Sequence, residues 1–145
     1  MIRRCRIDDA TAIQEINKYQ LGYDYPVTKT VDNLKRLLED KNHHFIFVFE
    51  NENTKKVEGY IHAELFEETY FDPMLNVLAL AVSSFSQGKG IGSQLMFRIE
   101  NEAENLNIKE IRLNSGESRN SAHKFYEKIG YTCSKKQKRF GKKLI

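Results

Sequence analysis

The segment "SQGKGIGSQL", Ser86 to Leu95, has three glycines at alternate positions. The apolar run "LNVLALAVSS" precedes it, and apolar residues at helical spacing follow it. The pattern predicts a strand, a glycine loop and a helix in immediate succession. A helix N-terminus has unpaired N–H groups and about half a positive charge, and glycine lets the main chain approach an anion or adopt positive φ. The loop is therefore typical of a phosphate site, although a tight turn that permits close packing of helix on strand gives the same spacing.

Three well-known phosphate loops are excluded by the same residues. A Walker loop needs G-x-x-x-x-G-K-[ST], which this stretch does not contain. A dinucleotide fingerprint needs G-x-G-x-x-G, and counting from Gly88 places Ser93 at the last glycine. A kinase loop fails for the same reason.

The composition is that of an ordinary globular protein. The chain has 145 residues, of which 40% are hydrophobic and 30% charged, with a net charge of +3. This length fits one domain, residues 1–145. No apolar run approaches the roughly 20 residues of a membrane helix, and the N-terminus lacks the apolar stretch of a secretory signal. Cys5 and Cys133 are far apart, so we expect two reduced thiols in a cytoplasmic protein. His43 and His44 lack further ligands at metal spacing, and we predict no metal.

Hydrophobic periodicity predicts an α+β fold with a mixed sheet. A strand, a crossover helix and a strand in that order imply parallel pairing, with the glycine loop at the carboxyl end of the first strand, where such sheets bind ligands. Pro73 is expected to separate two strands. The expected elements are a strand at 3–7, a helix capped by Asp8 or Asp9, a helix capped by Thr30, strands at 43–50, 57–68 and 74–82, a helix with Ile91, Leu95, Ile99, Ala103 and Leu106 on one stripe, a strand at 109–115, a helix capped by Asn120 and ended by Gly130, and a last strand at 131–140.

Two motifs resemble the GNAT family of N-acetyltransferases. The loop Gln87-Gly88-Lys89-Gly90-Ile91-Gly92 matches the family signature Q/R-x-x-G-x-G/A, and the apolar strand "LALAV" precedes it as in the family. Some thirty residues later, "NSAHKFYEKIGY" closely resembles the second motif, which contains A-x-x-F/L-Y-E-K-x-G-F/Y. The detailed likeness covers about Leu75 to Tyr131. Two motifs at this separation are far more specific than either alone.

The resemblance implies a sheet that splays open around acetyl-coenzyme A (acetyl-CoA). Main-chain groups at the end of the strand before the loop would then lack a strand partner and pair with the pantetheine arm. The pyrophosphate would meet the loop amides. Asn120 would reach the pantetheine arm, and a plain helix cap is its alternative role. The cofactor-binding residues so implied are Leu80, Ala81, Val82, Gln87, Gly88, Lys89, Gly90, Ile91, Gly92, Ser93, Asn120, Ser121 and Tyr126.

The implied reaction is direct acyl transfer from the thioester to an amine. The N–H near Val82 is a candidate donor to the oxyanion. Tyr126 resembles the tyrosine that protonates the leaving thiolate in many relatives, and a core aromatic residue is its alternative role. The strand before the loop lacks the carboxylate that some relatives use as a base. Glu64 and Glu117 are the candidates that remain, each also explained as an exposed ion-pair partner, and a water chain is a third route.

Two charge runs and one aromatic loop bear on partners. The acidic run Glu64 to Asp72 would attract a cationic amine or simply form a solvated hairpin. The basic run Lys135 to Lys143 would bind nucleic acid or an acidic protein, or form a solvated last strand. In the family, the region of "YQLGYDYP" helps to form the acceptor pocket, and its aromatic and acidic groups suit an amine. These groups are Tyr19, Tyr23, Asp24 and Tyr25.

The sequence therefore predicts an acetyl-CoA-dependent N-acetyltransferase acting on a primary amine of a small molecule or peptide. The main alternative is a non-catalytic acyl-CoA-binding or regulatory module of the same fold. A protein that binds nucleic acid through its basic run is the third hypothesis. Relatives often dimerise, and the sequence leaves a homodimer open. No membrane partner is expected.

Overall fold

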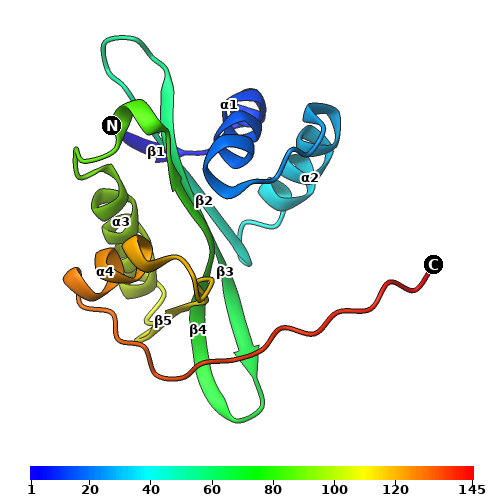
Figure 1. Ribbon diagram of the computed structural model, residues 1–145, viewed down its shortest axis with the longest axis vertical. Helices are drawn as coiled ribbons and strands as arrows, with labels where there is room; N and C mark the ends of the chain where they lie inside the picture. The colour runs from blue at the N-terminus through cyan, green and yellow to red at the C-terminus, as the bar shows by residue number, and fades with distance from the viewer. The chain divides into compact units, whose positions relative to one another are not determined.

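The computed structural model describes residues 1–145, which divide into two compact units, Met1–Asn114 and Ser115–Ile145. The first unit contains a five-stranded sheet in the order β1-β2-β3-β4-β5 (Figure 1). Its first four strands are antiparallel, whereas β4 and β5 run parallel, which confirms the predicted mixed sheet. The strands are β1 (Ile2–Arg4), β2 (His44–Glu50), β3 (Val57–Glu68), β4 (Phe71–Val82) and β5 (Ile111–Leu113).

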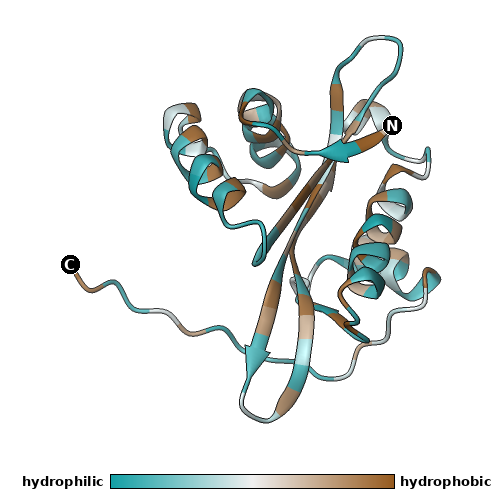
Figure 2. Ribbon diagram, turned by 180° about the vertical axis from the view of Figure 1, so that it is seen from behind, coloured by the Kyte–Doolittle hydropathy of each residue, from teal (hydrophilic) through white to brown (hydrophobic).

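Helices cover both faces of this sheet. On one face lie α1 (Ala10–Ile16), its continuation as a π-helical turn (Asn17–Leu21), and α2 (Val27–Glu39); on the other lies α3 (Ile91–Asn105) (Figure 1). Short 3₁₀ turns at Ile7–Asp9 and Ser84–Ser86 precede α1 and α3. Hydrophobic residues gather in the middle of the strands and on the inner sides of the helices (Figure 2).

The two faces have separate buried layers because strand side chains alternate. On the α1–α2 face, Ile13, Ile16 and Leu34 join a buried cluster with Ile46, Val48 and Tyr60. On the α3 face the largest fully buried side chains include Phe47, Ile61, Leu75, Leu95, Met96 and Ile99. The predicted stripe on α3 is buried except for Leu106, which follows the helix and is 46% exposed.

Two predicted boundaries were wrong. Thr30 does not cap α2, because Pro26 holds the N-cap position with a fixed φ of −57° and the helix begins at Val27. The Thr30 Oγ1 instead donates to the Pro26 carbonyl at 3.0 Å, one turn inside the helix. Pro73 does not separate β3 from β4 but lies inside β4, where a register irregularity tolerates a residue without an N–H.

An extra residue bends β4 near its middle. His62 pairs with Ala79 and Ala63 with Val77, so Leu78 has no partner on β3. The parallel ladder with β5 extends only from Leu75 to Val77. Beyond it, β4 is paired with β3 alone among the strands, and its other edge has no neighbouring strand.

The second unit contains α4 (Asn120–Lys128). Arg119, not Asn120, is the N-cap, and Asn120 is the first helical residue. Gly130 ends the helix as predicted: its φ is 101°, its N–H donates to the Glu127 carbonyl, and the N–H of Tyr131 donates to the Tyr126 carbonyl.

The predicted last strand at 131–140 is wrong, because residues 131–145 form neither strand nor helix. Six of the nine residues from Lys135 to Lys143 are Lys or Arg. A strand of that sequence would place like charges on both faces and have no apolar face to bury.

Candidate active site

The glycine loop joins β4 to α3. Gly88 and Gly90 have φ values of 82° and 80°, in the left-handed region that side chains other than glycine rarely adopt. A Cβ at either residue would meet no atom within 4 Å, so these glycines are needed for conformation and not for close packing. Close approach occurs instead at Gly59 in β3, where a Cβ would lie 3.3 Å from Ile91 Cγ2.

The N-terminus of α3 is left uncapped. Gly90 is the N-cap residue and supplies no side-chain hydrogen bond. The first N–H groups of a helix have no partner within the helix, so those of Ile91, Gly92 and Ser93 are available to an anion. Gln87 and Lys89 are exposed in the same loop. The arrangement suits a phosphate bound by main-chain donors.

Glu58 of β3 fixes the start of this loop. Its main-chain oxygen accepts from the Ser83 N–H at 2.8 Å, and its Oε2 accepts from the buried Ser86 Oγ at 2.5 Å. Asn51 Nδ2 donates to the other carboxylate oxygen at 3.1 Å. The hydrogen bond from Ser86 is the main reason that the pKa of Glu58 lies below its usual range. Sequence analysis missed this residue, since nothing in the strand pattern marks it.

The open edge of β4 ends beside the loop. Successive residues in a strand direct their main-chain groups to opposite sides, and Ser83 directs its N–H to β3. The Val82 main chain therefore faces away from β3, and so does that of Leu80. Gln87 Nε2 donates to the Val82 carbonyl at 3.1 Å and to Gln20 Oε1 at 2.9 Å. Strand-like pairing by a ligand at Val82 would replace this contact.

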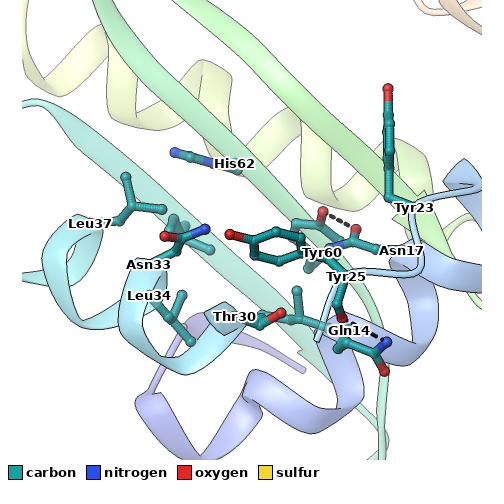
Figure 3. A pocket seen from close by; sticks show the side chains of 12 residues that line it. Gln14, Asn17, Tyr23, Tyr25, Thr30, Asn33, Leu34, Leu37, Tyr60 and His62 are labelled. Atoms are coloured by element: carbon teal, nitrogen blue, oxygen red, sulfur yellow. Dashed lines mark hydrogen bonds between the residues drawn. The ribbon is translucent and has the colours of Figure 1, made fainter. Parts of the chain in front are cut away.

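A pocket of about 150 Å³ lies on the α1–α2 face of the sheet (Figure 3). Its lining comes from α1, the π-helical turn, the segment before α2, α2 itself, β2 and β3. Tyr23 and Tyr25 of the predicted acceptor loop line it, and Tyr23 points away from the other labelled side chains. Tyr19 and Asp24 do not line it, and Tyr19 is 69% exposed. No lining residue is Asp, Glu, Lys or Arg.

Two polar groups of β3 reach this pocket. The Tyr60 hydroxyl donates to Asn17 Oδ1, and burial raises the pKa of Tyr60 to about 12. Two residues along, His62 Nε2 lies 2.9 Å from His44 Nδ1. Burial is the main cause that lowers the pKa of His62 to about 4. Sequence analysis missed both residues, although strand alternation places Tyr60, His62 and Glu64 on one face.

A family model described as the acetyltransferase (GNAT) family matches residues 10–131. The chain belongs to the GNAT family. No curated protein matches the chain.

Solved structures share the whole fold with this GNAT chain at low sequence identity. A transcriptional regulator from Bacillus halodurans C-125 has a TM-score of 0.87 and 22% identity over 97% of this chain and 98% of that one. The aminoglycoside 6'-N-acetyltransferase AAC(6')-IG from Acinetobacter haemolyticus has a TM-score of 0.84 and 14% identity over 100% of this chain and 99% of that one. AAC(6')-Iy in complex with the bisubstrate analogue CoA-S-monomethyl-acetylneamine has a TM-score of 0.84 and 15% identity over 99% of this chain and 98% of that one. These likenesses show the GNAT fold.

The candidate bases of this GNAT chain lie outside the pocket lining. Glu64 Oε2 accepts from Asn76 Nδ2 at 2.8 Å, and its Oε1 lies 3.8 Å from His43 Nε2. Asn76 in turn accepts from Arg112 of β5 at 2.9 Å. Glu64 thus belongs to a polar row across β3, β4 and β5. Glu117 is an exposed residue between β5 and α4.

The remaining GNAT motif residues lie on α4 in the second unit. Asn120 and Ser121 begin the helix, and Tyr126 lies in its last turn. The Tyr126 ring packs edge-on against Phe125 and Tyr131, with ring centroids 5.2 and 6.1 Å apart. The motif therefore brings three aromatic rings together at the end of α4.

Neither charge run contributes to the pocket. Glu67, Glu68 and Asp72 are exposed around the β3–β4 hairpin, and Lys135 to Lys143 are exposed in the C-terminal segment.

Both thiols are free, with Cys5 buried and Cys133 exposed. No group of three or more His, Cys, Asp or Glu side chains is placed to hold a metal ion. None of the helices has the length and apolar character needed to span a membrane.

Proposed function

We propose that this chain is an N-acetyltransferase that moves the acetyl group of acetyl-CoA directly to a primary amine of a small molecule or peptide. Membership of the GNAT family supports the reaction type. The observation that carries the proposal is local: a β4 edge that has no strand partner is followed, across the glycine loop, by the uncapped N-terminus of α3. One feature suits a diphosphate, and the other suits an extended arm that contains amides.

Acetyl-CoA would be held mainly by main-chain groups. Its pyrophosphate would accept from loop amides between Gln87 and Ser93, with Lys89 nearby as a point charge. Its pantetheine arm would pair with the main-chain groups of Leu80 and Val82 that face away from β3, where Gln87 now occupies the Val82 carbonyl, whereas the main chain of Ala81 between them faces β3. The family resemblance adds further contacts from α4. The full proposed set is Leu80, Ala81, Val82, Gln87, Gly88, Lys89, Gly90, Ile91, Gly92, Ser93, Asn120, Ser121 and Tyr126.

The proposed reaction forms a C–N bond and breaks the thioester C–S bond. The neutral amine attacks the carbonyl carbon, and the N–H near Val82 donates to the oxyanion that develops. The amine gives up one proton, for which Glu64 is a candidate acceptor. Tyr126 donates a proton to the leaving thiolate, and the proton lost by the amine later restores the phenol through solvent.

Two measurements on the purified protein test this function. Isothermal titration calorimetry with coenzyme A is expected to give saturable one-site binding. A thiol-release assay with acetyl-CoA and a panel of small amines and peptide N-termini is expected to find at least one acceptor. Absence of coenzyme A binding would remove the proposal.

A non-catalytic acyl-CoA-binding module is the second candidate. One structural neighbour is named a transcriptional regulator, so the fold alone does not establish turnover. Binding of coenzyme A without turnover of any amine in the panel would favour this candidate.

A further inference from the structure

We propose that His62 accepts the proton of the acceptor amine and passes it to His44, which releases it to solvent. The proposal rests on the proposed function and on the pocket of Figure 3 as the acceptor pocket. It assigns His62 as a catalytic residue and His44 as its relay partner. It also assigns removal of the amine proton to His62 and not to Glu64, because Glu64 does not line the pocket.

Among the side chains that line the pocket, one can accept the proton of the amine. The pocket contains phenols, carboxamides, a hydroxyl and aliphatic side chains, and no carboxylate or ammonium group. The Tyr60 phenol is already bonded to Asn17, and burial raises its pKa to about 12, so it does not serve as a base at neutral pH. His62 is the lining residue whose neutral side chain has a basic lone pair.

The geometry of the His62–His44 pair provides a route for the proton out of the pocket. His62 lies on β3 and His44 on β2, and the two strands pair so that Ile46 is opposite His62 and His44 is opposite Glu64. This diagonal places His62 Nε2 2.9 Å from His44 Nδ1, with the rings tilted by 52°. His62 lines the pocket, whereas His44 does not. A proton moving from His62 to His44 therefore leaves the pocket.

The proton balance closes within the pair. His62 begins with its Nε2–H donated to His44 Nδ1 and a lone pair on Nδ1. As the amine nitrogen bonds to the acyl carbon, it gives one proton to His62 Nδ1. The Nε2–H proton then moves to His44 Nδ1, and His44 loses its own Nε2 proton to water. Both rings end neutral, and exchange of ring protons with water restores the first tautomers.

The surrounding charges favour outward transfer. Burial and the neighbours His44 and His43 all disfavour a charged His62. Burial and His43 also lower the pKa of His44, but Glu64 of β3 and Asp40 after α2 act in the opposite direction on that ring. Neither carboxylate is among the causes of the shift in the pKa of His62. His62 is thus neutral when the amine arrives, and the positive charge is better tolerated on His44.

The test compares three histidine variants on the best amine of the panel. Gln can place an amide group near the position of the histidine Nε2, so His62→Gln and His44→Gln preserve polarity while removing the relay. We expect kcat to fall about 100-fold for His62→Gln and about 10-fold for His44→Gln, with little change in KM for acetyl-CoA. His43→Gln is the matched control, because His43 neighbours His44 but lies outside the relay, and its kcat is expected to stay within about twofold. Circular dichroism establishes that each variant is folded, and titration establishes that it binds coenzyme A.

A second acceptor and a spectrum make the test specific. With an analogue of the same amine bearing fluorines on its β-carbon, which lowers the amine pKa, the His62→Gln deficit is expected to shrink. ¹⁵N NMR of the wild-type histidine rings is expected to show neutral His62 as the Nε2–H tautomer between pH 6 and about pH 8.

The outcomes distinguish this proposal from the proposed function. Wild-type kcat in His62→Gln, an equal loss in His43→Gln, or His62 as the Nδ1–H tautomer would each overturn the relay while acetyl transfer stands. A loss in Glu64→Gln with none in His62→Gln would return the base role to Glu64. Failure of the wild-type protein to bind coenzyme A would instead remove the proposed function, and the relay with it.

Discussion

The buried hydroxyl of Ser86 donates to Glu58 Oε2 at 2.5 Å, which ties the start of the glycine loop to the neighbouring strand β3. Ser83 makes a second tie through its N–H and the Glu58 carbonyl. The loop has no capping side chain of its own at α3. Its position therefore depends on Glu58, which lies outside both sequence motifs.

Ser86→Ala tests this dependence. The substitution leaves one Glu58 oxygen without its buried donor, so we expect the free energy of unfolding to fall by about 1–3 kcal/mol in urea titrations. We also expect weaker coenzyme A binding by calorimetry, because the loop amides lose their fixed position. Ser84→Ala is the control, since Ser84 is exposed in the same turn. Unchanged affinity in Ser86→Ala would mean that other contacts position the loop.

Gly90→Ala separates backbone strain from ligand binding. Gly90 has a φ of 80°, and an L-residue there costs about 1–2 kcal/mol. Gly22 has a φ of 78°, and neither glycine has an atom within 4 Å of an added Cβ, so Gly22→Ala carries the same strain away from the loop. Both variants are expected to lose similar stability in thermal unfolding, and only Gly90→Ala to lose coenzyme A affinity. Equal affinities in the two variants would contradict the assignment of the loop.

The hydrophobic periodicity and the turn residues that interrupt it were sufficient to predict most of the first unit. The alternating run from Val57 to Glu68 predicted β3 to the residue. The change from alternation to helical spacing at the glycines predicted α3 and the parallel strand. The errors arose where one local rule was opposed by another: Thr30 is a favoured cap, but Pro26 fixes the helix start, and Pro73 fits inside β4 because the ladder is irregular there.

The candidate site was only partly predictable for a different reason. The loop lies in one continuous segment, so spacing reveals it. The pocket brings together residues from α1, α2, β2 and β3, and its two polar groups on β3 depend on which face of the strand is buried. His62 lies within an ordinary alternating pattern, and its contact with His44 depends on the β2–β3 register, which the sequence does not state.

Asp9 makes part of the stability dependent on pH. Burial opposes its ionisation, but hydrogen bonds from Arg3 at 2.8 and 2.9 Å and from the Arg6 N–H at 2.8 Å outweigh this effect, so its pKa lies below the usual value. A carboxyl with a lowered folded pKa stabilises the protein above its unfolded pKa of about 3.9, and this contribution is lost as the pH falls through the folded value.

Urea unfolding from pH 7 to about pH 2.5 measures this contribution. Asp9→Asn is expected to cost about 1–3 kcal/mol at pH 7 and progressively less below about pH 4, because the wild-type protein then loses the same charge. Asp8→Asn is the control, since Asp8 is exposed beside it. A pH-independent difference between the wild type and Asp9→Asn would show that the ion pair with Arg3 is not the source.

Tyr126→Phe tests the proposed proton donor to the leaving thiolate. The substitution removes only the hydroxyl and keeps the ring that packs against Phe125 and Tyr131. We expect kcat to fall about 10²–10⁴-fold with the best amine of the panel, because the thiolate then leaves without a proton donor. The KM for acetyl-CoA is expected to change far less, since the donor acts on charge that develops in the transition state. Tyr131→Phe loses a hydroxyl from the same aromatic group and is expected to retain its turnover. Near-wild-type kcat in Tyr126→Phe would assign the phenol to packing alone and leave thiolate protonation to solvent.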